Sequence, residues 1–165
     1  QGGIGKTTLA LVLADKFKDR CPDAQLFITL RGASSTPMPV ADALAQLVRA
    51  FYPNAKLPET VAELQALYRS VLAGHKALVV LDDARDRAQV EPLLPPAGCL
   101  ALVTSRQHFT LPGLYVQHLD TLPPADAEAL LLRISPRRPV GAQSCAGICR
   151  WLCAWRPPPW RKASA

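Results

Sequence analysis

The sequence predicts an α/β fold in which helices cover both faces of a parallel sheet. Segments with helical and strand-like hydrophobic patterns alternate along the 165 residues, as in proteins built from β–α units. A glycine-rich segment leads directly into the first predicted helix, and a continuous apolar run further along ends in two aspartates. Together these features indicate one domain whose ligand-binding groups lie at the carboxyl edge of the sheet.

Apolar residues spaced three or four positions apart predict five helices. These helices cover residues 6–18, 40–51, 61–72, 88–94 and 124–134. Thr60 and Glu63 form a capping box at the start of the third helix, where their side chains can bond free amides. The apolar face of the first helix is expected to be Leu9, Val12, Leu13 and Phe17, and that of the third Val61, Leu64, Leu67, Tyr68, Val71 and Leu72.

Short runs rich in apolar and β-branched residues predict the strands of the sheet. The runs cover residues 25–30, 76–81 and 100–104, with a weaker candidate at 114–118. The second and third runs are continuously apolar, which is typical of parallel strands buried on both faces.

Residues 1–8 match the body of a phosphate-binding loop, G-x-x-x-x-G-K-[ST]. Glycines allow the backbone to curl around a polyphosphate with its amides pointing inward, and the following helix adds its positive end. A glycine turn before an ordinary helix is the alternative, which the intact Gly-Lys-Thr and the helical run behind it disfavour. The predicted nucleotide-binding residues are Gly2, Gly3, Ile4, Gly5, Lys6, Thr7 and Thr8.

Three side chains of this loop have distinct expected roles. Lys6 would reach the β- and γ-phosphates, Thr7 would complete the coordination of Mg²⁺, and Thr8 would approach the α-phosphate. The first glycine of the pattern falls one position before Gln1, and the strand that feeds the loop would lie earlier still. We therefore expect the chain to be a fragment that lacks the first strand of its sheet.

Two aspartates and an arginine at strand ends supply the other half of the predicted site. Asp82 is assigned to the metal, opposite Thr7, and Asp83 to the attacking water. Arg106 follows the next buried strand, where its guanidinium could contact the γ-phosphate. The alternatives are an ordinary polar turn for the aspartates and a surface position for the arginine.

Charge and cysteine content exclude several other classes of function. Seven basic and no acidic residues follow Glu128, whereas the first 128 residues carry twelve basic and thirteen acidic groups, so no nucleic-acid groove is expected across the main domain. No apolar run approaches the ~20 residues that span a bilayer. Cys145, Cys149 and Cys153 lack a second ligand pair or a nearby histidine, so we expect reduced thiols of a cytoplasmic protein rather than a metal site.

The motifs together resemble the NB-ARC type of nucleotide-binding domain, within the STAND class of P-loop signal-transduction ATPases. The similarity covers residues 1–134, and the sequence at 26–32 and 68–74 most resembles the bacterial regulators of this class. It rests on residues 2–10, 78–84 and 102–106 in the family's order and spacing, with further likeness at 26–32, 68–74 and 119–132.

This resemblance implies a three-layer α/β/α P-loop NTPase in which the phosphate-loop strand lies between the strand before Arg106 and the last strand. It implies an ATP/ADP switch with slow, Mg²⁺-dependent hydrolysis in a regulatory protein that self-oligomerises. Two alternatives remain open, a motor or transporter ATPase and an inactive truncated gene product. The chain has neither a Leu-Ser-Gly-Gly-Gln transporter signature nor an Asn-Lys-x-Asp guanine motif, which favours ATP.

Residues 135–165 depart from the family pattern and form a separate basic segment rich in proline and tryptophan. The family continues with a small helical domain in which the proline of a Gly-x-Pro segment contacts adenine. Pro157 is the nearest candidate here, but the leucines expected around it are absent. A shift of reading frame near residue 135 is one hypothesis for this change in composition.

Overall fold

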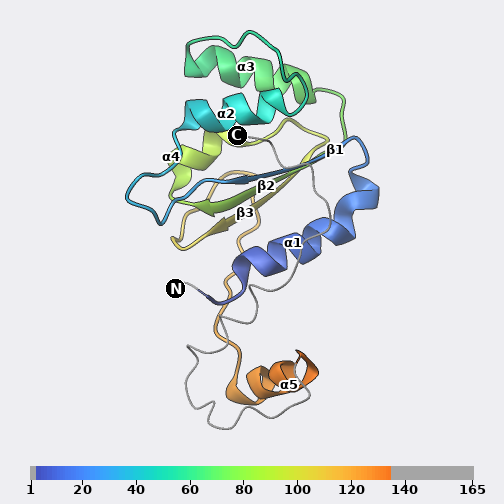
Figure 1. Cartoon of the computed structure of the whole chain (residues 1–165), viewed down its shortest axis with the longest axis vertical. Coiled ribbons are helices and arrows are strands. Elements are labelled where there is room, and N and C mark those ends of the chain that lie inside the picture. Colours follow the sequence, from blue (N-terminus) through green and yellow to red (C-terminus); the bar gives the residue numbers. More distant parts are fainter. Residues whose placement is uncertain (1–2, 135–165) are drawn as a thin grey trace.

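A three-stranded parallel sheet lies between two layers of helix in the computed structural model, which describes residues 3–134 (Figure 1). The strands are β1 (Ala24–Thr29), β2 (Ala77–Ala84) and β3 (Leu100–Ser105), side by side in that order. The predicted α/β class with a parallel sheet is confirmed, and the arrangement is consistent with a P-loop NTPase-like fold.

Strand β2 is the centre of the sheet and is buried on both faces, as predicted from its apolar run. All of its residues except Asp83 are buried. Successive side chains of a strand point to opposite faces. Val79 and Leu81 accordingly join the larger core cluster on one face, whereas Leu78 and Val80 join the smaller cluster on the other.

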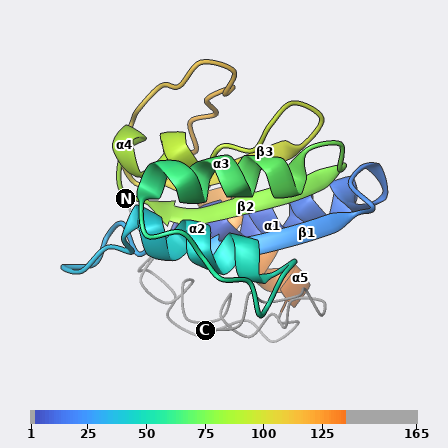
Figure 2. The same cartoon turned by 90° about the horizontal axis from the view of Figure 1, so that it is seen from above.

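The larger cluster lies beneath the helices that follow β1 and β2. These are α2 (Val40–Arg49), α3 (Val61–Leu72) and the short α4 (Arg87–Val90), with a 3₁₀ turn η2 at Glu91–Leu93. Helices α2 and α3 lie side by side over this face (Figures 1 and 2). The hydroxyl of fully buried Tyr68 donates a hydrogen bond to the carbonyl of Leu93 at 3.0 Å, which links α3 to η2.

The opposite face of the sheet is covered by α1 (Lys6–Phe17), which continues into the 3₁₀ turn η1 (Lys18–Arg20). Its buried residues are Ala10 and Ala14, which pack with Leu78 and Val80 of β2. The expected apolar face was therefore wrong in part, since Leu9 and Val12 are exposed. The small alanine side chains, rather than the larger apolar ones, therefore make the buried contact of this helix with the sheet.

The start of α3 makes one of the two side-chain-to-amide bonds of the predicted capping box, and one predicted core residue lies outside the core. The Glu63 amide donates to Thr60 Oγ1 at 3.3 Å, and the two side chains are hydrogen-bonded at 2.7 Å. Val61 was expected in the core but is exposed, whereas Leu64, Tyr68 and Leu72 of the same helix are buried as predicted.

Strand β3 differs from its prediction because only Thr104 among its six residues is buried. One edge of β3 pairs with β2, and no strand among residues 3–134 pairs with the other edge. The weaker strand candidate at 114–118 was wrong, since these residues form no strand. They do not pair with the free edge of β3 or with any other strand in the described part of the chain.

The last described element is α5 (Pro124–Ile134), as its sequence predicted, and it lies apart from the sheet (Figure 1). No helix within residues 3–134 is long and apolar enough to cross a membrane. The predictions for the tail, including the three spaced cysteines, Pro157 and the frame shift near residue 135, lie outside the described residues.

The Tyr68 hydrogen bond gives a direct test of packing on the α2–α3 face. Tyr68→Phe leaves the buried carbonyl of Leu93 without its donor, so the free energy of unfolding should fall by about 1–2 kcal/mol. Tyr52→Phe, at a residue that is 58% exposed, should change it by less than about 0.5 kcal/mol. Urea unfolding of both variants checks this, and equal stabilities would contradict the described contact.

Candidate functional site

The glycine-rich loop turns into α1 through residues in the left-handed region of backbone conformation. Gly3 has a φ of 82° and Gly5 a φ of 87°, values that cost a residue with a side chain roughly 1 kcal/mol or more. Helix α1 begins at Lys6 without a side-chain cap and without an acidic residue in its first turn. Its first amides and positive dipole end therefore face the loop, as an anion site requires.

The structure places most of the predicted loop residues around this turn. Ile4 and Lys6 line an open pocket beside α1, and Thr8 lies half-buried in the first helical turn. Gly2 lies outside the described residues, so the structure does not place it.

Thr7 and Asp82, which are predicted to hold the metal, are in direct contact although 75 residues separate them. The Thr7 hydroxyl donates a hydrogen bond to Asp82 Oδ1 at 2.7 Å, joining the first turn of α1 to β2. Asp82 is 7% exposed. A hydroxyl and a carboxylate are oxygen ligands of the kind that Mg²⁺ takes, usually with phosphate oxygens and water completing the shell.

No cluster of three or more His, Cys, Asp or Glu side chains that could hold a metal occurs in the described residues. Any Mg²⁺ here would therefore depend on the Thr7 and Asp82 oxygens together with its phosphate ligand, which is how Mg²⁺ is held in many nucleotide sites.

A β-bulge in β2 sets the directions of the two aspartates. Leu81 pairs with Val103 and Ala84 pairs with Ser105, so Asp82 and Asp83 together lie opposite Thr104. Asp83 adopts a φ of 52°, a conformation that costs a non-glycine residue about 1–3 kcal/mol. Bulges next to functional sites commonly redirect a side chain in this way.

The structure brings Asp83 and Arg106, the two predicted catalytic residues, into contact with each other. Arg106 Nε lies 3.4 Å from Asp83 Oδ1, while the amide of Ala33 donates to Asp83 Oδ2 at 3.2 Å. The Arg106 side chain is 53% exposed, so water screens this ion pair and its contribution to stability is small.

The sequence alone assigned no role to the loop after β1, which is hydrogen-bonded to the backbone of Asp82 and Asp83. The amides of Leu30 and Gly32 donate to the carbonyls of Asp82 and Asp83, at 2.7 and 2.6 Å. A Cβ at Gly32 would overlap the backbone of Ala84 and Arg85, so this position requires glycine.

Gln89, a buried residue of α4 that was also missed, holds the same loop in place. Its side-chain amide donates to the carbonyls of Leu30 and Met38 at 3.1 and 2.9 Å. Its side-chain oxygen accepts a hydrogen bond from the Arg85 amide at 2.8 Å. A glutamine on a short helix carries no recognisable signal in the sequence, because its partners are backbone groups of a distant loop.

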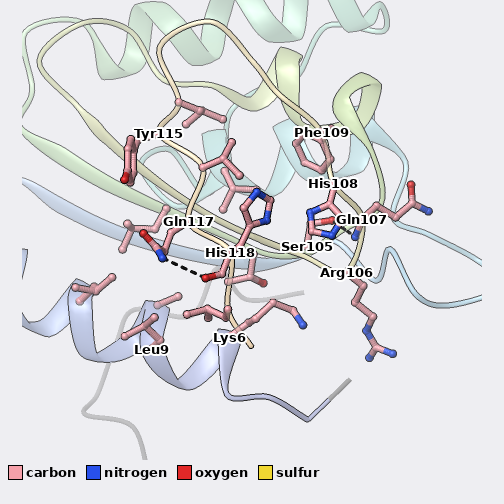
Figure 3. Close-up of a pocket in the computed structure, with 18 of the residues that line it drawn as sticks. Lys6, Leu9, Ser105, Arg106, Gln107, His108, Phe109, Tyr115, Gln117 and His118 are labelled. Carbon is pink, nitrogen blue, oxygen red and sulfur yellow. Dashed lines mark hydrogen bonds between the residues drawn. The ribbon is translucent and has the colours of Figure 1, made fainter. Parts of the chain in front are cut away.

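An open pocket of 810 Å³ lies between α1, the unpaired side of β3 and residues 113–120 (Figure 3). Leu9 and Leu13 of α1 line it, which accounts for the exposure of Leu9. Lys6 and Arg106 extend toward the same side of the view in Figure 3.

The two cysteines of the described region differ in burial, since Cys21 is buried and Cys99 is partly exposed. Cys21 and Cys99 are free thiols, and burial raises the pKa of the Cys21 thiol above its usual range. A thiol with a raised pKa is a weak nucleophile and a poor metal ligand at neutral pH.

Comparison with known proteins identifies two close relatives, although no family model matches the chain. The chain is 41% identical over 150 residues to "Regulatory protein AfsR" of Streptomyces coelicolor and, to the same extent, to the protein of that name from Streptomyces griseus. Each match covers 89% of this chain but 15% of the relative. The chain is therefore homologous to a small part of a much longer regulatory protein.

Gly32 provides a test of the support behind the aspartates. In Gly32→Ala the new methyl group meets backbone rather than a movable side chain, so unfolding should become easier by about 1–3 kcal/mol. Ala33→Ser, at the neighbouring exposed residue, should stay within about 0.5 kcal/mol of the unsubstituted protein. Thermal or urea unfolding measures both, and a Gly32→Ala protein of unchanged stability would contradict the close approach.

Proposed function

We propose that this chain is the nucleotide-binding part of an ATP/ADP switch in a signal-transduction or transcriptional-regulatory protein. The observation that carries the proposal is the Thr7–Asp82 hydrogen bond, because it joins a glycine-rich helix start to a buried carboxylate at the end of β2. A phosphate cradle beside a Mg²⁺-type ligand pair is the minimum that triphosphate binding needs.

The relatives support a regulatory setting for this activity. Both are described as regulatory proteins, and the matched part is 15% of their length, so a sensing or effector function would lie elsewhere in such a protein. The NB-ARC and STAND resemblance adds the expectation of self-oligomerisation, a cytoplasmic location and slow turnover.

Each predicted residue has a defined task in this proposal. The amides of Gly2 to Gly5 and the start of α1 bind phosphate oxygens, and Lys6 neutralises the β- and γ-phosphates. Thr7 and Asp82 hold Mg²⁺, which supplies charge neutralisation at the transferred phosphoryl group.

Asp83 and Arg106 act at the γ-phosphate end of the site. Asp83 orients the attacking water, and Arg106 contacts the γ-phosphate as an alternative to its pairing with Asp83. An exposed guanidinium can make this exchange at little cost, because its ion pair is weak.

Replacing the loop lysine tests the binding function. Lys6→Ala removes the cation assigned to the β- and γ-phosphates, so ATP affinity should fall at least about tenfold. Lys16→Ala, at an exposed cation on the same helix, should bind like the unsubstituted protein. Isothermal titration of the full-length polypeptide with ATP and Mg²⁺ measures this; unchanged affinity in Lys6→Ala would refute the assignment.

Replacing the second aspartate separates binding from hydrolysis. Asparagine tolerates a positive φ and can still accept the Ala33 amide, so Asp83→Asn should bind ATP normally but hydrolyse it about 10²–10⁴ times more slowly. Asp19→Asn, at an exposed residue of η1, serves as the control. Phosphate release under single-turnover conditions is the measurement, and a normal rate would place the water-orienting role elsewhere. Rapid, sustained turnover would instead favour a motor-type ATPase.

A further inference from the structure

Thr104 is the one buried residue of β3, and its hydroxyl occupies the centre of the bulge. It donates a hydrogen bond to Asp82 Oδ1 at 2.7 Å and accepts one from the Asp83 amide at 2.9 Å. Thr104 is 7% exposed, so water does not compete effectively for these bonds. One hydroxyl therefore contacts both Asp82 and Asp83.

The direction of these bonds follows from the number of protons available. A threonine hydroxyl carries one proton and can accept further hydrogen bonds. The Asp83 amide can only donate, so the hydroxyl proton is free to point at Asp82. Thr7 donates to the same oxygen, so two hydroxyl groups fix Oδ1 of Asp82 from two sides.

Strand structure alone does not call for a hydroxyl at this position. Valine has nearly the same shape as threonine and suits a strand equally well. What valine cannot do is satisfy the Asp83 amide, which the bulge removes from the regular pairing of β2 with β3.

We propose that Thr104 is a positioning residue for the divalent-metal site, because its hydroxyl fixes the Asp82 carboxylate and the bulged Asp83 backbone in the orientation that Mg²⁺ binding requires. The proposal rests on the nucleotide-binding function proposed above and adds a residue to it. Thr104 acts through Asp82 rather than by touching the metal or nucleotide itself. Groups that orient a metal ligand in this way commonly change metal affinity by 10–100-fold.

The test compares how strongly Mg²⁺ improves ATP binding in three variants. Thr104→Val removes the hydroxyl at constant shape, and Thr104→Ser retains it. Ser105→Ala is the matched control, since Ser105 donates to the Ala84 carbonyl and so joins β3 to β2 without contacting Asp82. ATP affinity is measured with Mg²⁺ and with EDTA by titration calorimetry on the full-length polypeptide, and urea unfolding is recorded for each variant.

Thr104→Val should lower the Mg²⁺-dependent gain in affinity about tenfold or more, while affinity in EDTA changes less than about twofold. Thr104→Ser should keep the gain within about threefold of the unsubstituted protein, and Ser105→Ala should keep it in full. A full Mg²⁺ gain in Thr104→Val, or an equal loss in Ser105→Ala, would overturn the proposal.

The same measurements separate three outcomes: a variant that does not fold, a protein without Mg²⁺-dependent binding, and a Thr104 without a positioning role. If Thr104→Val fails to fold, Thr104→Ala, which also lacks the hydroxyl, replaces it in the same comparison. If both fail to fold while Thr104→Ser folds, the hydroxyl is required for folding itself and the positioning proposal is wrong. If the unsubstituted protein gains no affinity from Mg²⁺, the metal-dependent switch itself is refuted. A Mg²⁺-responsive protein with a fully responsive Thr104→Val variant would refute only the role of Thr104.

Discussion

The site depends on the carboxyl end of β2, where the chain leaves regular strand geometry beside the first turn of α1. Asp82 meets Thr7 there, and the backbone of Asp83 takes a left-handed conformation. Three hydrogen bonds hold Asp83 in this conformation. Its amide donates to the Thr104 hydroxyl, its carbonyl accepts from the Gly32 amide, and its carboxylate accepts from the Ala33 amide. Strain maintained by several independent contacts is characteristic of functional positions.

Elements with strong periodic or compositional signals were predictable from the sequence. The run from Ala77 to Leu81 is apolar throughout, and a strand buried on both faces is the simplest structure that accommodates it. The start of α3 was also predictable, because the Thr60 and Glu63 pair specifies its position. Local chemistry determines these features, so distant neighbours do not alter them.

Predictions that depend on the neighbours of an element were less successful. The apolar face of α1 was misjudged because small residues make its contact with the sheet, and alanine gives little hydrophobic signal. The segment at 114–118 has strand-like residues but pairs with no strand among residues 3–134. At the site, motif spacing indicated Thr7 and Asp82 as partners, whereas Thr104, Gly32 and Gln89 act through backbone geometry that the sequence does not display.

The hydrogen bonds of Gln89 have a consequence for how the protein responds to ionic strength. The loop behind the aspartates is tied to α4 by a neutral amide and backbone groups, which dissolved ions barely affect. The Arg106–Asp83 pair lies at the surface, where counter-ions weaken it across a Debye length of about 8 Å at physiological concentration. Added salt should therefore weaken the Arg106–Asp83 ion pair while leaving the hydrogen bonds of Gln89 to the loop unchanged.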